Sequence, residues 1–375
     1  MPNPYDPQNP AKPDYFGGRI EALQIANERL DRAFRSNQSG GILVYGHRGV
    51  GKSSLLKKVS DIASKDDNDN PKNTIIIYRR LSKTTSDSEL YQILNEELLQ
   101  KIEERKSVID TLKKAGRSLN GINFFQFGVE FGKEMQEKTV YQKWKIYLNS
   151  LKNVDYVLVA IDDADYLSTE ALGELKTIIE DSGKVPIILV VSGGIQFESR
   201  LVDEYSPIAR IFSGASINLS RFSIEETTEV LTKPLIVEKN TKWDKDAIKE
   251  VQTYTYGFPY LVQCLASASY QENKSITHDR VKESTKAALS IGRSWLDNEI
   301  KSASDQDVQS FAKLVKLNKE IFKSSEINHA GVLSPYIGRL VKLGVIKKEN
   351  RGRYSLQKSP MIAIYGMLKR NLHSD

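Results

Sequence analysis

One short stretch constrains what this chain can fold into more than any other, and it reads Gly46-His47-Arg48-Gly49-Val50-Gly51-Lys52-Ser53. An apolar run over residues 42–45 precedes it, and apolar residues recur at helical spacing after it, so we expect a strand, a glycine-rich turn and a helix. The pattern G-x-x-x-x-G-K-[ST] is typical of a loop whose backbone N–H groups surround phosphate oxygens. We predict that this stretch and Ser54 bind a nucleotide, with Lys52 at the β- and γ-phosphates and Ser53 at Mg²⁺.

Composition narrows the class of protein. The length of 375 residues suggests two or three domains. No apolar run approaches the roughly 18 residues of a membrane span, and the first residues have neither the basic nor the apolar region of a signal peptide. The single cysteine, Cys264, excludes an intrachain disulfide. We therefore expect a cytoplasmic protein without a membrane partner.

Strands and helices alternate through the first part of the chain. Apolar runs over residues 74–78, 156–161, 185–191 and 217–219 predict strands, and helices are predicted over 20–35, 86–104, 141–151 and 168–181. This alternation favours a parallel sheet with helices on both faces. Beyond Arg221 the pattern is helical only, without a further strand until about residue 345, so a domain boundary is expected there.

One segment does not fit the alternation. Residues 122–131 mostly alternate apolar with polar, which predicts a strand or hairpin within an insertion over about 116–134. A small satellite sheet packed on the core and a contact for a partner or DNA are both open interpretations. Residues 1–15, rich in Pro, Asn and Asp, are expected to be extended and irregular.

An acidic pair closes one of the predicted strands. Asp162 and Asp163 follow the apolar run 156–161, and ligands of such sheets bind at the carboxyl ends of the strands. We predict that Asp162 holds Mg²⁺ and that Asp163 orients the attacking water. The alternative for an Asp pair after a strand is a helix cap or turn. Arg210 is a candidate arginine finger toward a neighbouring subunit, with a solvated or salt-bridged arginine as the alternative.

These motifs together resemble a known family. The segment Phe16-Gly17-Gly18-Arg19, the P-loop, the Asp162-Asp163 pair, Ser192 and Gly257-Phe258-Pro259 are similar, in order, to motifs of archaeal AAA+/STAND ATPases, relatives of archaeal origin-recognition initiators. The resemblance implies a five-stranded AAA+ core over 1–221, a helical lid over 222–302 and a winged helix over 303–375. It also implies ATP and Mg²⁺ as cofactors.

The resemblance assigns roles to four residues outside the P-loop. It implies that Phe16 and Arg19 lie near the adenine, that Ser192 faces the γ-phosphate, and that Pro259 belongs to the lid. The chain lacks the lid arginine that origin-recognition proteins usually carry, which favours a nucleotide-gated switch over rapid hydrolysis. From residue chemistry alone, residues 257–259 are equally a turn between lid helices.

The C-terminal end is basic. Residues 319–370 carry 11 Lys and Arg against 3 Asp and Glu, a net charge of +8, so the rest of the chain carries −2 of the overall +6. Helices are predicted over 305–317, 324–328 and 332–343, followed by strands over 345–348 and 353–356, which is the order of a winged helix. The predicted DNA-binding residues are Arg339, Lys342, Lys347, Lys348, Arg351 and Arg353. A protein-interaction module and a merely solubilising charge are the alternatives.

Three functions are compatible with this pattern. The leading hypothesis is a Mg²⁺-dependent ATPase that couples its nucleotide state to double-stranded DNA binding or to self-association. The second is an ATP-binding, DNA-associated regulator, similar to a replication initiator, that has little turnover. The third is an interaction scaffold that holds protein partners through the winged helix.

Overall fold

The computed structural model describes residues 3–66, 69–104, 139–151, 153–236 and 241–372. The chain forms two compact units. Arg19–Leu219 is one unit, and the chain before Arg19 joins the chain from Ser220 onward in the other. The alternating segment predicted over 116–134 lies outside the described residues. Among the helices that the structure does describe, none combines the length and the apolar character needed to cross a bilayer.

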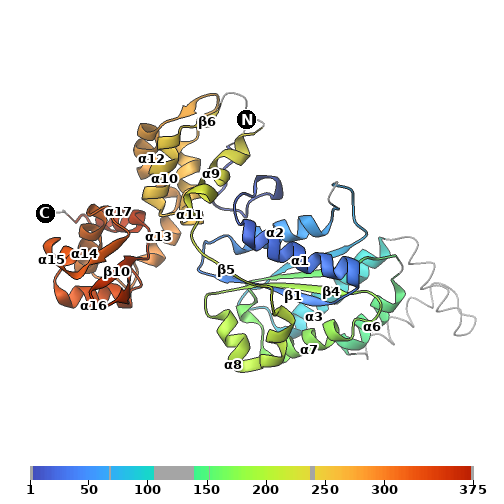
Figure 1. Cartoon of the computed structure of the whole chain (residues 1–375). Helices are drawn as coiled ribbons and strands as arrows, with labels where there is room; N and C mark the ends of the chain where they lie inside the picture. The colour runs from blue at the N-terminus through green and yellow to red at the C-terminus, as the bar shows by residue number, and fades with distance from the viewer. Residues whose placement is uncertain (1–2, 67–68, 105–138, 152, 237–240, 373–375) are drawn as a thin grey trace, which may run out of the picture. The chain divides into compact units, whose positions relative to one another are not determined.

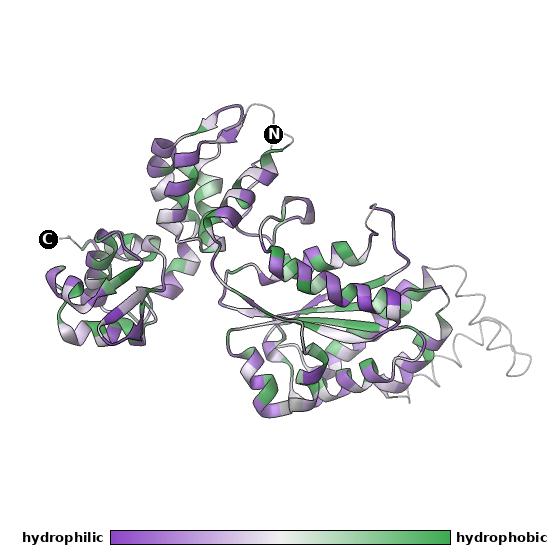
Figure 2. Cartoon of the chain, viewed as in Figure 1, coloured by the Kyte–Doolittle hydropathy of each residue, from purple (hydrophilic) through white to green (hydrophobic). Residues whose placement is uncertain are grey.

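A parallel sheet forms the centre of the first unit. Its strands are β1 (Gly40–Gly46), β2 (Ile75–Arg80), β3 (Val157–Asp162), β4 (Ile187–Gly193) and β5 (Ser216–Leu219). They lie in the order β2-β3-β4-β1-β5, and all neighbouring pairs are parallel. Every residue of β3 and β4 is buried, because both strands have neighbours on each side and helices above and below (Figure 2).

Helices cover both faces of this sheet, as the alternating pattern predicts (Figure 1). The helices α1 (Ile20–Ser36) and α2 (Lys52–Ala63) lie on one face. The opposite face carries α3 (Asp87–Glu103), α6 (Val140–Ser150), α7 (Thr169–Glu180) and α8 (Phe197–Ala209). Two short 3₁₀ helices, η2 (Ala164–Tyr166) and η3 (Arg210–Phe212), follow β3 and α8. The fold is therefore the five-stranded α/β core that the sequence predicts.

The second unit begins with a helical bundle. It contains α9 (Ile224–Thr232), η4 (Lys233–Leu235), α10 (Lys245–Thr255), α11 (Pro259–Ser269), α12 (His278–Ile291) and α13 (Arg293–Glu299). The connections before α10 and α12 form a small parallel pair, β6 (Lys242–Trp243) with β7 (Ser275–Ile276). The expectation that no strand occurs between Arg221 and about residue 345 is wrong here. Strands of two residues are too short to leave an alternating pattern in the sequence.

The C-terminal part of this unit combines helices with an antiparallel sheet. The order is α14 (Asp305–Lys316), β8 (Ile321–Lys323), α15 (Ser324–His329), α16 (Ser334–Lys342), β9 (Ile346–Asn350), β10 (Arg353–Leu356) and α17 (Pro360–Lys369). The three strands lie in the order β8-β10-β9. Three helices and a hairpin were expected in this order. The strand β8 and the helix α17 are additions that the sequence pattern did not indicate.

The N-terminal segment packs on the helical bundle instead of remaining irregular throughout. It contains the 3₁₀ helix η1 (Pro13–Tyr15), and the side chain of Tyr5 is only 2% exposed. Trp243 Nε1 donates to Tyr5 Oη at 2.7 Å, and Tyr5 Oη in turn donates to the carbonyl of Leu231. The rings of Trp243 and Tyr270 meet the Tyr5 ring edge-on. This aromatic contact fixes a segment whose composition predicts extended, irregular structure.

Candidate nucleotide and metal site

The predicted phosphate-binding loop joins β1 to α2, and its glycines have left-handed backbone angles. The φ angles of Gly46, Gly49 and Gly51 are 151°, 87° and 95°. A Cβ on Gly46 would lie 2.5 Å from the carbonyl oxygen of Leu219, so no side chain fits there. A Cβ on Gly51 would meet nothing within 4 Å. The loop therefore keeps an open concave side, as a phosphate cradle requires.

Lys52 is the first residue of α2, and its side chain folds back over the loop. Its Nζ donates to the carbonyls of Gly46 at 3.0 Å and His47 at 3.2 Å. Burial lowers the pKa of Lys52, while the carboxylates of Asp162, Asp163 and Asp165 oppose that shift. The ammonium thus lies within electrostatic reach of the acidic strand end.

Ser53 follows at the positive end of the helix dipole, where backbone N–H groups favour an anion. Its hydroxyl has no hydrogen-bond partner in the part of the chain that the structure describes. No acidic residue lies in the first turn of α2 to compete with a phosphate.

The sheet brings the loop and the acidic pair to one edge. Gly46 ends β1, Asp162 ends β3, and β4 lies between these strands with Ser192 paired to Val44. Asp162 is 1% exposed. Tyr78 Oη donates to Asp162 Oδ2 at 3.1 Å, and Ser192 Oγ donates to Asp162 Oδ1. Burial and the neighbouring Asp162 charge raise the pKa of Tyr78, so its hydroxyl remains a donor.

Asp163 has a left-handed backbone, with φ of 59°. Its N–H donates to Ser192 Oγ at 3.1 Å, and its Oδ2 accepts from Arg80 Nε at 2.8 Å. This hydrogen bond with Asp163 raises the pKa of Arg80. Sequence reasoning missed both Tyr78 and Arg80. Both residues lie near the carboxyl end of β2, where ligands of parallel sheets bind, so their position at the end of the predicted strand could have indicated them.

Arg200 and the predicted finger Arg210 differ in their surroundings. Arg200 donates to the carbonyls of Asp165 and Leu167, both at 2.7 Å, so it fixes the turn after β3. The Asp165 carboxylate accepts from the N–H of Gly194 at 2.8 and 2.9 Å, which joins that turn to the end of β4. Arg210 is exposed, and no described residue pairs with it.

Three further residues were predicted to lie at the nucleotide, and they belong to different units: Arg19 to the first, Phe16 and Pro259 to the second. Arg19 is buried at the start of α1, and its Nη2 donates to the carbonyl of Val50 at 3.2 Å, which ties α1 to the loop. Phe16 and Pro259 are buried in the helical unit. Their roles at a nucleotide stay predictions.

The residues at the strand ends suit Mg²⁺ better than a softer metal. The candidate ligands, the Ser53 hydroxyl and the Asp162 carboxylate, are hard oxygen donors, and Mg²⁺ usually combines one or two protein oxygens with phosphates and water. No group of three or more His, Cys, Asp or Glu side chains in the described residues could hold a metal by itself. Such a site needs a phosphate to complete it.

The predicted DNA-binding residues lie on α16 and the β9–β10 hairpin, and most are free. Lys342, Lys348, Arg351 and Arg353 are exposed, with no ion-pair partner among the described residues, and Lys347 lies 3.6 Å from Glu349. Arg339 differs, because its guanidinium binds the fully buried carboxylate of Asp307. Arg339 Nε lies 2.8 Å and Nη2 2.6 Å from the two oxygens of Asp307. Arg339 therefore fixes α16 to α14.

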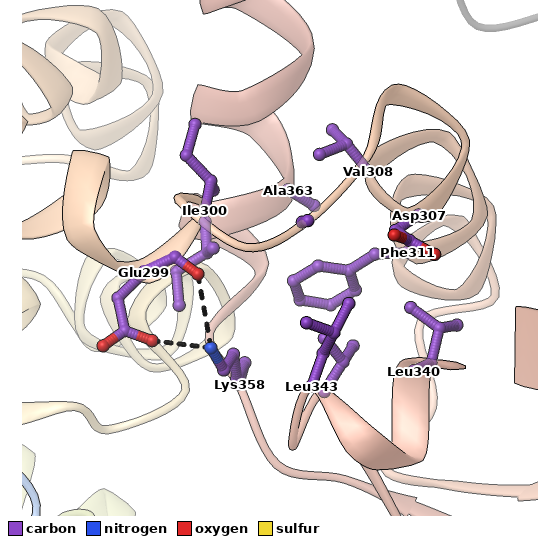
Figure 3. A pocket seen from close by; sticks show the side chains of 12 residues that line it. Glu299, Ile300, Asp307, Val308, Phe311, Leu340, Leu343, Lys358 and Ala363 are labelled. Atoms are coloured by element: carbon purple, nitrogen blue, oxygen red, sulfur yellow. Dashed lines mark hydrogen bonds and ion pairs between the residues drawn. The ribbon is translucent and has the colours of Figure 1, made fainter. Parts of the chain in front are cut away.

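A small cavity lies beside this pair. It measures about 20 Å³, which is close to the space for one water molecule. Val308, Phe311 and Leu340 line it with Asp307, and Lys358 binds Glu299 on the other side (Figure 3). Its size excludes a nucleotide.

Comparisons with known proteins agree with the geometry. Residues 35–201 match the family model described as the AAA domain. The Aeropyrum pernix ORC2 protein, in ADPNP–ADP complexes, superposes with a TM-score of 0.59 at 13% identity, covering 95% of this chain and 96% of that one. Its ADP form gives 0.56 at 14% identity, covering 99% and 98%. A comparison with curated protein sequences gives no match. Residues 35–201 are therefore an AAA domain of the P-loop ATPase class, within a chain that shares the fold of the ORC2 protein.

Proposed function

We propose that this protein is a Mg²⁺-dependent switch that binds and hydrolyses ATP. One observation carries the proposal: the open glycine loop after β1 and the buried Asp162 after β3 lie at the same edge of one sheet, with Lys52 electrostatically coupled to the acidic pair. The similar ORC2 protein was solved with ADPNP and ADP, which supports an adenine nucleotide as the ligand.

Each residue has a distinct task in this proposal. The loop N–H groups and Lys52 bind the phosphates, and Lys52 exchanges its bonds to two loop carbonyls for bonds to phosphate oxygens. Ser53 and Asp162 would hold Mg²⁺, which neutralises charge on the phosphates. Asp163 orients the attacking water.

Replacing the loop lysine tests the proposal. Lys52→Ala should abolish ATP binding, measured by calorimetry. Lys57→Ala is the matched control, because Lys57 lies on the same helix and no described residue pairs with it. Unchanged ATP affinity in Lys52→Ala would remove the assignment.

Coupling to DNA is the finer part of the proposal. Five exposed cations on α16 and the β9–β10 hairpin support duplex binding through phosphates, namely Lys342, Lys347, Lys348, Arg351 and Arg353. Each phosphate contact lowers the slope of log affinity against log salt by about 0.9. Removing Lys348 should therefore make that negative slope shallower by about 0.9. A slope near zero in the parent protein would contradict duplex binding and favour a protein-interaction role. Arg210, exposed and unpaired among the described residues, supports self-association through an arginine finger.

A second candidate, an ATP-binding regulator with little turnover, is favoured by the contact between Arg80 and Asp163. The guanidinium occupies Oδ2 of Asp163, which is then less available to a water. If the contact restrains hydrolysis, Arg80→Ala should raise steady-state ATP turnover. Arg32→Ala is the control, because Arg32 is exposed on α1, outside the phosphate-binding loop, and has no hydrogen-bond or ion-pair partner among the described residues. A lower rate in Arg80→Ala would mean that Arg80 instead supports catalysis.

A further inference from the structure

Three adjacent strands each contribute one polar side chain to a single buried contact. Tyr78 comes from β2, Asp162 from β3 and Ser192 from β4, and these strands are neighbours in the sheet. Tyr78 Oη lies 3.1 Å from Asp162 Oδ2, and Ser192 Oγ donates to Oδ1. Both carboxylate oxygens are therefore held by hydroxyls from opposite sides.

The hydroxyl proton of Ser192 is used in this contact. A serine hydroxyl has one proton to donate and two lone pairs that accept. Ser192 gives its proton to Asp162 and accepts the N–H of Asp163 at 3.1 Å. A phosphate oxygen only accepts hydrogen bonds. Ser192 is also 0% exposed, so its proton is committed to the carboxylate and is not offered to a phosphate.

The carboxylate itself keeps capacity for a metal. Two carboxylate oxygens provide about four lone-pair sites, and the hydroxyls of Tyr78 and Ser192 occupy two of them. One site on each oxygen is left for Mg²⁺ or for its bound water. Partners that orient a metal ligand in this way usually affect metal affinity.

We propose that Tyr78 and Ser192 are positioning residues that fix the carboxylate of Asp162 for Mg²⁺, and that Ser192 does not contact the γ-phosphate. The inference rests on the proposed nucleotide function and departs from the role that the family resemblance implies for Ser192. Tyr78 has no role in that resemblance. The two hydroxyls act together, because each holds a different oxygen of the same group.

Nucleotide affinity with and without metal tests the proposal. Dissociation constants for ADP and for a non-hydrolysable ATP analogue are measured by calorimetry in Mg²⁺ and in EDTA, for Tyr78→Phe and Ser192→Ala. Two controls remove hydroxyls of the same unit that do not touch Asp162. Tyr156→Phe removes a bond to the carbonyl of Ala63, and Ser39→Ala removes an acceptor at the opposite end of β4.

The outcomes separate a positioning role from a phosphate contact. In Mg²⁺, we expect both variants to bind ADP and the ATP analogue about 10- to 100-fold more weakly than the parent protein, by the same factor for each nucleotide. In EDTA, their affinities should equal those of the parent. The controls should keep the full Mg²⁺ effect. If Ser192→Ala in EDTA binds the ATP analogue more weakly but ADP as before, the proposal is overturned. An unchanged Mg²⁺ effect in Tyr78→Phe would overturn it as well. The Tyr78→Phe measurement alone decides the question if Ser192→Ala does not fold. Absence of nucleotide binding by the parent protein would refute the proposed function itself.

Discussion

Removing one hydroxyl from the N-terminal segment tests whether Tyr5 anchors it to the helical unit. Tyr5→Phe keeps the ring and its edge-on contacts with Trp243 and Tyr270, and it deletes only the oxygen. That oxygen accepts from Trp243 Nε1 at 2.7 Å and donates to the Leu231 carbonyl. Both partners would be left without this bond at a site where Tyr5 is 2% exposed.

The expected cost follows from these two groups. A buried donor or acceptor left unsatisfied costs about 1 to 3 kcal/mol, and a neutral indole N–H and a carbonyl belong to the lower part of that range. We therefore expect Tyr5→Phe to lower the free energy of unfolding of the helical unit by about 2 to 4 kcal/mol. Tyr15→Phe is the control, because no described residue hydrogen-bonds its hydroxyl, and it should change stability by less than about 0.5 kcal/mol.

Urea unfolding followed by tryptophan emission measures this difference. Trp243 and Trp295 lie in the helical unit and Trp144 in the other, so Trp144→Phe as a common background isolates the signal. Equal unfolding midpoints for Tyr5→Phe and Tyr15→Phe would refute the reasoning. The segment would then lie against the bundle without stabilising it.

Two further predictions concern backbone strain and acid stability. Gly257→Ala should destabilise the protein more than Gly214→Ala, because a Cβ on Gly257 would lie 2.1 Å from the Phe222 carbonyl oxygen. Gly214 has a similar positive φ but nothing within 4 Å of an added Cβ, so Gly214→Ala should lower the free energy of unfolding by only about 1 to 2 kcal/mol. Equal losses in urea unfolding would contradict this. The hydrogen bonds from Arg339 hold the pKa of Asp307 well below its usual range. This stabilisation is therefore fully present above the unfolded pKa of about 3.9, and it is lost progressively as pH falls from there through the lower pKa of the folded state. Asp307→Asn should therefore flatten the decline of stability below about pH 5, and a parallel decline in both proteins would exclude the ion pair as its source.

Much of the core could be predicted because its signals are local. The apolar run over 156–161 corresponds to β3 at Val157–Asp162, shifted by one residue, since a fully buried strand between polar segments is evident from composition alone. The phosphate loop is equally local, because spacing within eight residues defines it. The helical unit was less predictable, since the strands β6 and β7 have only two residues each.

The rest of the candidate site depends on which strands become neighbours. Tyr78 reaches Asp162 only because β2 pairs with β3, and the two residues are 84 positions apart. Arg339 resembled a free cation on an exposed helix, and its partner Asp307 lies 32 positions earlier on another helix. No periodicity or motif relates such pairs, so side-chain partners were missed while backbone elements were found.

The hydrogen bond between Tyr5 and Trp243 joins residues 238 positions apart, which matters while the chain is still being made. At about 5 to 20 residues per second, a ribosome needs roughly 10 to 50 seconds to add the second partner after the first. The phosphate-binding core can complete its sheet during that interval, because β5 ends at Leu219. The first residues of the chain therefore lack this contact until about two thirds of the protein has been made.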